Sequence, residues 1–134
     1  MIEYKNNLAS IDSFSLDGFF VGWPNPPNSD VFRKVLKNSY KVIYAIDDNK
    51  LVGFINAISD GVLSAYIPLL EVLPEHQGRG IGKKLVQLMQ EELSDLYMID
   101  LLCDKNLLPF YENLGMKPAT GVLIRNYDKQ NGVP

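Results

Sequence analysis

The amino-acid sequence of 134 residues predicts a mixed α+β fold. Three strand-like apolar runs, separated by short turn signals, follow one another in the first half of the chain and favour an antiparallel sheet. A strand, a glycine-rich turn, a long amphipathic helix and a further strand come next, which is typical of a parallel crossover unit. The length suits one core better than two, so we expect residues 1–134 to form a single domain.

Composition narrows the classes of protein that the chain can belong to. Hydrophobic residues make up 46% and charged residues 22% of the chain, the balance of a globular protein. A formal charge of −3 argues against a nucleic-acid partner. No apolar run approaches the roughly 20 residues of a membrane span, and the first residues lack the features of a signal peptide. Because Cys103 is the sole cysteine, we expect no metal site and a reducing, cytoplasmic setting.

The first half of the chain is predicted to hold one helix and three strands. Residues 17–29 are expected to be irregular, because they contain two glycines and three prolines. Asp30 is the expected cap of a short helix that runs to about Lys37. Strand-like runs then cover residues 40–46, 51–58 and 63–73, with turn signals at residues 47–50 and 59–61.

The second half centres on the helix that follows the glycines. Its apolar residues recur at helical spacing along one stripe, namely Ile81, Leu85, Leu88, Met89, Leu93 and Leu96. A buried strand is expected over residues 97–103. Asn106 is the expected cap of a second helix, which Gly115 is placed to end. A last strand over residues 121–127 is expected to close the sheet.

The glycine-rich turn has the sequence Gln77-Gly78-Arg79-Gly80-Ile81-Gly82. Glycines let a diphosphate approach the backbone, and the N–H groups at a helix start point outward at the positive end of the helix dipole. Arg79 and Lys83 add positive charge, and Gln77 is expected to bind either a phosphate oxygen or the turn itself. The spacing is neither the Rossmann G-x-G-x-x-G nor a P-loop. The sequence therefore predicts a site for another phosphate-bearing ligand, with a plain helix-opening turn as the alternative.

Two motifs carry a resemblance to a known family. Gln77-x-x-Gly80-x-Gly82, preceded by Val72-x-Pro74, matches the Q/R-x-x-G-x-G/A motif of the GNAT N-acetyltransferases. Asn106 followed by Phe110-Tyr111-Glu112-Asn113-Leu114-Gly115-Met116 resembles the second cofactor-binding segment of that family. The resemblance covers residues 51–116, about half of the chain. Residues 51–54 and 58–62 also resemble the subgroup that contains the plant-type serotonin (arylalkylamine) N-acetyltransferases.

This resemblance implies a fold, a cofactor and a reaction. The fold would be a mostly antiparallel twisted sheet of about six or seven strands, flanked by about four helices, with a splayed strand pair at the cofactor site. The reaction would move an acetyl group from acetyl-CoA directly to a primary amine. Members of the family are often dimers, so the resemblance also implies a homodimer. The residues implied in binding coenzyme A are Val72, Leu73, Gln77, Gly78, Arg79, Gly80, Ile81, Gly82, Lys83, Asn106, Phe110 and Tyr111.

Direct attack requires a neutral amine. Freeing an amine of pKa about 10.4 at pH 7 costs roughly 4–5 kcal/mol, so the site needs a base or a desolvating pocket. Glu71 is the candidate base, because it interrupts an apolar strand just before the glycine turn and resembles carboxylates that serve some members of the superfamily. The alternative for Glu71 is a partly solvated strand position. Asp60 and Asp104 are further candidates at strand ends.

The departing thiolate and the oxyanion also need donors. The resemblance places Tyr111 at the leaving sulfur, although the same side chain shares a helix face with Leu107 and Leu114. Proton transfer from a phenol of pKa near 10 to a thiolate of pKa near 8.5 costs about 2 kcal/mol. A hydrogen bond from the phenol to the thiolate is therefore at least as favourable as full proton transfer. The family's usual oxyanion donor is an N–H on the strand at residues 69–73, assisted by a bulge whose start Pro68 could mark.

The acceptor is expected to be a small-molecule amine. The loop at residues 18–28 could wall its pocket with Phe19, Phe20 and Trp23, or could instead cover a satellite apolar cluster. Cys103 is expected to be a small buried hydrophobe, and His76 a solvated loop residue. Three alternatives stay open: a protein or peptide amine as acceptor, a non-catalytic acyl-CoA-binding module, and a phosphate-binding regulatory domain.

Overall fold

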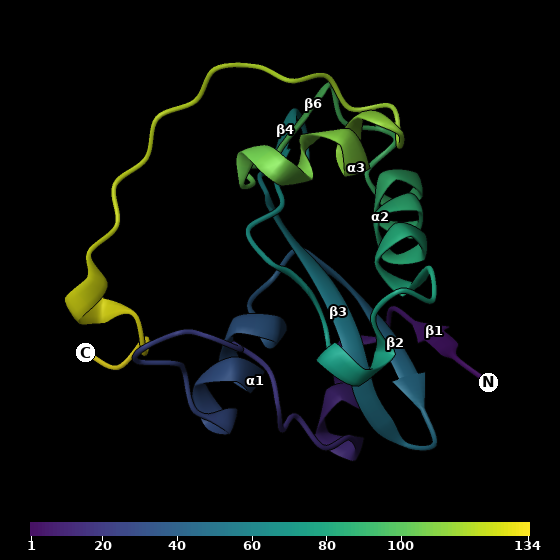
Figure 1. Ribbon diagram of the computed structural model, residues 1–134, viewed down its shortest axis with the longest axis vertical. Coiled ribbons are helices and arrows are strands. Elements are labelled where there is room, and N and C mark those ends of the chain that lie inside the picture. Colours follow the sequence, from purple (N-terminus) through teal and green to yellow (C-terminus); the bar gives the residue numbers. More distant parts are fainter.

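The computed structural model describes the backbone of residues 1–134 and the side chains of residues 1–7 and 9–134. Strands and helices alternate in the mixed order that the sequence predicts (Figure 1). The α-helices are α1 (Ser29–Lys37), α2 (Ile81–Glu92) and α3 (Leu108–Glu112). The strands are β1 (Glu3–Lys5), β2 (Lys41–Asp47), β3 (Lys50–Ser59), β4 (Ser64–Tyr66), β5 (Leu70–Val72) and β6 (Met98–Asp100). Short 3-10 helices cover Leu8–Ser13, Pro74–His76, Lys105–Leu107 and Tyr127–Lys129.

The strands form one sheet in the order β1-β2-β3-β4-β6, and β5 pairs separately with β3. All neighbours are antiparallel except β4 and β6, which are parallel and are joined through α2. The predicted succession of antiparallel strands followed by a crossover unit is therefore confirmed. The N-terminal strand β1, which we did not predict, extends the sheet beyond β2.

Helices cover both faces of this sheet, α1 on one face and α2 with α3 on the other (Figure 1). Successive side chains of a strand point to opposite faces. In β2, Val42 and Tyr44 accordingly pack into the core around α1, whereas Ile43 and Ala45 pack into the core around α2. Burial on both faces explains why the central strands are continuous apolar runs in the sequence.

The third apolar run is divided in two, because the chain leaves the ladder at residues 67–69. Ile67 donates to the Asp100 carbonyl oxygen at 2.9 Å, and beyond that point β5 pairs with β3 alone. The buried side chain of Asn56 bridges the interruption. Its Oδ1 accepts the Leu69 N–H at 3.1 Å, and its Nδ2 donates to Ser39 Oγ at 3.0 Å. The splayed strand pair is thus confirmed, with Pro68 inside the break.

Two predicted helix caps are wrong. The cap of α1 is Asn28, whose Oδ1 accepts the Val31 N–H at 2.9 Å, and Asp30 lies inside the first turn. Asn106 does not cap α3, because the chain enters that helix through the 3-10 helix Lys105–Leu107. In both places the first helical turn begins before the residue at which the apolar pattern places the start of the helix. Gly115 ends α3 as predicted, with a φ of +87° that favours glycine.

The C-terminal part departs most from the predicted strands. The strand expected over residues 97–103 is only β6, three residues long, and it forms an exposed edge of the sheet instead of a buried strand. Residues 121–127 form no strand, although their apolar pattern is strand-like. They run extended away from the sheet, so their backbone groups have no neighbouring strand to pair with (Figure 1).

The described residues contain neither a helix with the length and apolar character of a membrane span nor a cluster of three or more metal-ligating side chains.

The core around α1 contains a phenol whose ionisation should limit stability in alkali. Tyr44 is fully buried, and its hydroxyl has no hydrogen-bond partner among the described residues. Burial, together with the nearby Asp12 carboxylate, raises the pKa of Tyr44 from 10.0 to about 12. The unfolded chain therefore loses this proton first as the pH rises, so the free energy of unfolding should fall between pH 10 and pH 12, by up to ~2 kcal/mol.

Urea denaturation of the wild type and Tyr44→Phe from pH 8 to pH 12 measures this effect. We expect Tyr44→Phe to lose less stability over that range and to lose nothing at pH 8, where the removed hydroxyl is unpaired. Equal alkaline losses in the two proteins would contradict this role of Tyr44.

Candidate active site

The glycine turn leads from the 3-10 helix Pro74–His76 into α2. Gly78 and Gly80 have φ values of +76° and +79°, in the left-handed region that side chains rarely adopt. A Cβ at either position would meet no atom within 4 Å. Both glycines are therefore required by the backbone conformation, and the space in front of them is open to a ligand.

The amides of this turn are available for binding. The His76 and Gln77 N–H groups donate to carbonyl oxygens within the preceding turn, and the first helical bond of α2 runs from Lys84 to Gly80 at 3.1 Å. The N–H groups of residues 78–83 have no acceptor among the described residues, and no side chain caps the helix. The 12-residue α2 thus starts with a cluster of free donors at the positive end of its dipole.

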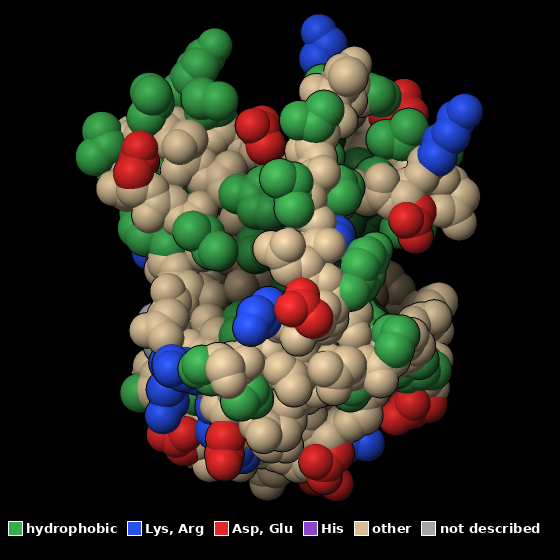
Figure 2. Space-filling view, turned by 90° about the vertical axis from the view of Figure 1, so that its left-hand side faces the viewer, with side chains coloured by type: hydrophobic (Ala, Val, Ile, Leu, Met, Phe, Trp, Pro, Cys, Tyr) green, Lys and Arg blue, Asp and Glu red, His purple; other side chains and the backbone are tan. Residues whose placement is uncertain are grey.

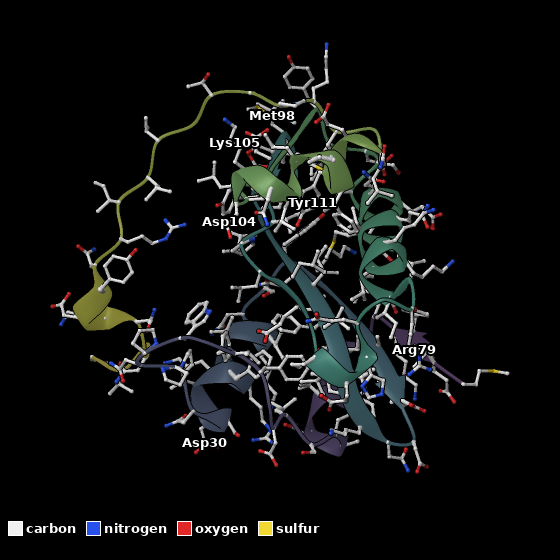
Figure 3. All side chains as sticks on the ribbon, viewed as in Figure 1. Asp30, Arg79, Met98, Asp104, Lys105 and Tyr111 are labelled. Atoms are coloured by element: carbon white, nitrogen blue, oxygen red, sulfur yellow. The ribbon has the colours of Figure 1, made fainter. Side chains whose placement is uncertain are left out.

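Positive charge accompanies these amides. Arg79 and Lys83 are both exposed, and neither forms an ion pair with a described residue. Figure 3 shows Arg79 projecting outward from the turn before α2. Gln77 donates from Nε2 to the Val72 carbonyl oxygen at 3.0 Å, so its side chain bonds the end of β5 and not the glycine turn. The arrangement can bind a diphosphate.

The turn lies beside the gap in the sheet. Leu73 and Leu69 direct their N–H groups toward β3, where they bond the Val52 carbonyl at 2.8 Å and Asn56 Oδ1. Because alternate residues of a strand direct their backbone groups to opposite sides, the N–H groups of Leu70 and Val72 point into the gap. An elongated ligand held at the turn would find these donors along the edge of β5.

The two motif segments meet at Gly82. A Cβ at that position would lie 3.8 Å from both Phe110 Cζ and Val72 Cγ2, an ordinary contact distance. Phe110 in turn packs edge-on against Tyr111, with ring centroids 4.9 Å apart. Sequence motifs that lie far apart along the chain therefore share one place in the fold. Asn106, from the same second segment, is exposed on the 3-10 helix before α3.

A cavity of about 320 Å³ opens between the strand break and α3. Its lining includes Ile67, Leu70, Cys103, Asp104, Tyr111 and Arg125. Tyr111, a residue of α3 (Figure 3), is almost fully buried, and its hydroxyl bonds no described residue. Burial, with a smaller contribution from neighbouring Cys103, raises the pKa of Tyr111. The phenol therefore stays protonated at neutral pH and can donate a hydrogen bond into the cavity. Cys103, expected to be buried, is half-buried at the cavity wall.

Glu71 points to the opposite face of the sheet. Its carboxylate accepts the Phe20 N–H at Oε1, at 2.8 Å, and the Val21 N–H at Oε2, at 3.3 Å. Phe20 has a φ of +62°, a conformation that needs support from its surroundings. Glu71 therefore holds the loop at residues 18–28 against β5.

The aromatic residues of that loop are divided between core and surface. Phe19 and Phe20 pack edge-on against Phe32, with centroids 5.6 Å and 4.9 Å away, and belong to the apolar cluster under α1. Trp23 leaves 37% of its surface exposed. The loop was expected either to wall the amine pocket or to cover an apolar cluster. Phe19 and Phe20 belong to an apolar cluster, whereas Trp23 is free to contact a ligand.

The other candidate acids and bases are engaged elsewhere. The Asp60 carboxylate accepts N–H bonds from Leu63, Val62 and Ser64, which hold its pKa below the usual value and make it a poor base. His76 is not the solvated residue that was expected. Only 14% of its side chain is exposed, and Nε2 lies 3.4 Å from Asp47 Oδ2. Among Asp60, His76 and Asp104, it is Asp104 that lines the cavity beside Tyr111.

Asn56 is a residue of the candidate site that we did not predict. It positions the strand break, and the signal for it was present as a polar side chain in the middle of the apolar run at residues 51–58.

Comparison with known proteins agrees with this geometry. The model of the "Acetyltransferase (GNAT) family" matches residues 8–116. Among curated proteins, the chain is 33% identical to the "GCN5-related N-acetyltransferase 2, chloroplastic" of Arabidopsis thaliana, over 81% of this chain and 51% of that protein. It is 34% identical to the "Histone acetyltransferase TAP1" of Glycine max, over 72% of this chain and 47% of that protein. The chain thus spans about half the length of these relatives.

A solved structure extends the similarity to nearly the whole chain. A candidate acetyltransferase from Deinococcus radiodurans R1 superimposes with a TM-score of 0.92 and 42% sequence identity, covering 99% of this chain and 94% of that chain. The family model covers most of the chain, and both of its motifs converge on the open turn and the strand gap. This chain belongs to the GNAT family of acetyltransferases.

Proposed function

We propose that this chain transfers an acetyl group from acetyl-CoA to the primary amine of a small molecule, by direct attack and within the single domain of residues 1–134. The observation that carries the proposal is the set of free amides at residues 78–83 beside the gap between β5 and β6. A cavity of about 320 Å³ next to that gap lies at the small end of sites for small molecules.

The residues present suit acetyl-CoA, which when bound supplies an activated acetyl thioester. The amides of residues 78–83 would hold the diphosphate, with Arg79 and Lys83 adding charge. The Leu70 and Val72 N–H groups would bond the carrier along β5 and donate to the oxyanion. Tyr111 would donate a hydrogen bond to the leaving sulfur, because its raised pKa makes full proton transfer still less favourable.

Glu71 would take the proton of the attacking amine, directly or through a water. A carboxylate offers about four acceptor positions, and the loop amides of Phe20 and Val21 use two of them. The same side chain can therefore order the loop and accept a third N–H. Trp23, exposed on this loop, would form part of the acceptor wall.

Replacing Glu71 by Gln should lower kcat/KM by about 10²- to 10⁴-fold, because the amide cannot take a proton and can accept only one of the two loop N–H groups. The measurement is the steady-state kinetics of both proteins, in which the variant should lose kcat. Glu91→Gln, at an exposed position on α2, is the matched control and should behave as wild type. A variant that keeps kcat and only raises KM would limit Glu71 to ordering the loop.

A protein amine is the second candidate acceptor, supported by the Glycine max relative that is named a histone acetyltransferase. Thiol release from acetyl-CoA with a panel of small amines and lysine peptides separates the candidates. Turnover with small amines supports the proposal, and turnover with peptides alone supports the second candidate. Coenzyme A binding without any turnover would identify a binding module. Equal competition by nucleotides would point to a general phosphate site.

The homodimer that the resemblance implies stays a prediction. One relative is named as chloroplastic, so the cytoplasmic setting expected from the sequence also stays a prediction.

A further inference from the structure

The cavity between the strand break and α3 contains the sole cysteine of the chain. Ile99, Leu101 and Cys103 alternate along β6 and beyond it, and all three pack against the core around α2. Cys103 therefore continues the alternation of the strand, with its side chain on the face of the sheet that α2 and α3 cover. The thiol is half-buried, forms no disulfide and bonds no described residue.

A second group in the same cavity points to a ligand. Only 9% of the surface of Tyr111 is exposed, yet the side chain lines the cavity and its hydroxyl bonds no described residue. A buried polar group without a partner costs about 1–3 kcal/mol, so this hydroxyl is expected to bond a molecule that enters the cavity. Cys103 lies close enough to contribute to the raised pKa of Tyr111. A ligand atom that accepts from Tyr111 therefore lies beside the Cys103 thiol.

The sulfur of coenzyme A is such an atom, and the inference drawn here rests on the function proposed above. Figure 3 shows Arg79 below the lower end of α2 and Tyr111 beside the upper part of that helix, so a ligand that reaches both is elongated. Coenzyme A has its diphosphate at one end of a pantetheine chain and its thiol at the other. With the diphosphate at the glycine turn, the sulfur would arrive at Tyr111, where it meets the sulfur of Cys103.

The cavity is open on its outer side. Its volume is about 320 Å³, and Leu102, Leu107 and Leu123 in its lining are exposed to solvent. Figure 2 shows hydrophobic side chains exposed mostly in the upper half of the molecule, the half that contains β6 and α3 in Figure 1. An apolar mouth therefore connects the two sulfurs with solvent, and a group attached to the cofactor sulfur can leave through it.

We infer that Cys103 forms a mixed disulfide with coenzyme A when the oxidised cofactor, coenzyme A disulfide, occupies the site, and that this bond closes the site to acetyl-CoA. Cys103 gives up its thiol proton, and its sulfur bonds the sulfur of the cofactor half that the turn holds. The S–S bond of the oxidised cofactor breaks, and its other half leaves as a thiolate that takes up the proton. One disulfide replaces another, so no further oxidant is consumed.

Binding at the turn makes this exchange selective. A cofactor held there presents its sulfur to Cys103 at an effective concentration far above that of a free disulfide in solution. The thioester of acetyl-CoA contains no sulfur–sulfur bond, so the productive cofactor does not undergo this exchange. The modification therefore responds to the oxidised cofactor and not to acetyl-CoA.

Intact mass and acetyl-CoA binding, measured on the full chain after incubation with coenzyme A disulfide and desalting, test the inference. We expect the wild type to gain the mass of one coenzyme A group and to lose acetyl-CoA binding in isothermal titration, and dithiothreitol to restore both. Cys103→Ala should gain no mass and should bind acetyl-CoA after the same treatment. Because Cys103 is the sole cysteine, the added mass locates the bond.

Glutathione disulfide distinguishes a built site from a thiol that is merely reactive. In the folded protein we expect coenzyme A disulfide to modify Cys103 at least about 10²-fold faster than glutathione disulfide, because only the former is held at the turn. In urea the two disulfides should react at nearly equal rates. Gly80→Glu should remove the advantage of coenzyme A disulfide in the folded protein, whereas Gly61→Glu, whose glycine has a similar φ of +78°, should keep it.

Two results would overturn this inference and leave the proposed function standing. One is a wild type that binds acetyl-CoA but gains no mass or, when folded, reacts equally fast with both disulfides. The other is full acetyl-CoA binding by completely modified protein. A wild type that binds neither acetyl-CoA nor coenzyme A disulfide would overturn the inference and the proposed function together.

Discussion

Gly80→Glu should abolish coenzyme A binding while leaving the fold in place. The new side chain would project into the open space in front of the turn, where the diphosphate is proposed to bind, and its negative charge would repel that group. Losing two charge-assisted hydrogen bonds of about 1.5–3 kcal/mol each lowers affinity by at least about 10²-fold. Isothermal titration with coenzyme A measures the change.

Gly61→Glu is the matched control for this variant. Gly61 has a φ of +78°, almost the value at Gly80, and lies in the turn between β3 and β4. Both variants therefore carry the same backbone strain, of order 1 kcal/mol, and only one of them alters the proposed site. We expect Gly61→Glu to bind coenzyme A normally. Equal affinities for Gly80→Glu and the wild type would remove the glycine turn from the cofactor site.

Tyr111→Phe should reduce kcat by about 10²-fold with little change in coenzyme A affinity. The removed hydroxyl is proposed to donate to the departing sulfur, an interaction made chiefly in the transition state. The fold should tolerate the change, because this hydroxyl bonds no described residue. Steady-state kinetics with an amine that supports turnover, together with titration of coenzyme A, separates the two effects.

The pH dependence of kcat gives a second test of the role of Tyr111. Because burial raises its pKa above 10.0, the hydroxyl stays protonated up to that pH, and its loss should not contribute an alkaline decline in kcat below pH 10. Tyr127→Phe, at an exposed position near the C-terminus, is the control and should keep wild-type kinetics. A Tyr111→Phe variant with the same kcat as the wild type would exclude Tyr111 from the chemistry.

The features that the sequence predicts well are those encoded locally. The stripe from Ile81 to Leu93 requires a helix, and the glycines before it have the left-handed conformations that only glycine adopts readily. The antiparallel strands follow from apolar runs with turn residues between them. The position of the proposed phosphate site can therefore be predicted from these elements alone.

The features that the sequence does not predict depend on contacts between distant segments. The run at residues 63–73 reads as one strand, and its division depends on Asn56 from β3. Glu71 reads as a free carboxylate until the loop amides of Phe20 and Val21 are seen to bond it. The strand-like residues 121–127 show the same limit, because a strand needs a neighbour and none lies beside them in one copy of the chain.

The most direct test is the amide spectrum of ¹⁵N-labelled protein titrated with coenzyme A. If the turn before α2 binds the diphosphate, the largest saturable shifts will belong to the N–H groups of residues 78–83, with smaller ones at Leu70 and Val72, and Gly80→Glu will remove them all. Saturable binding that leaves the resonances of residues 78–83 unmoved would contradict the account.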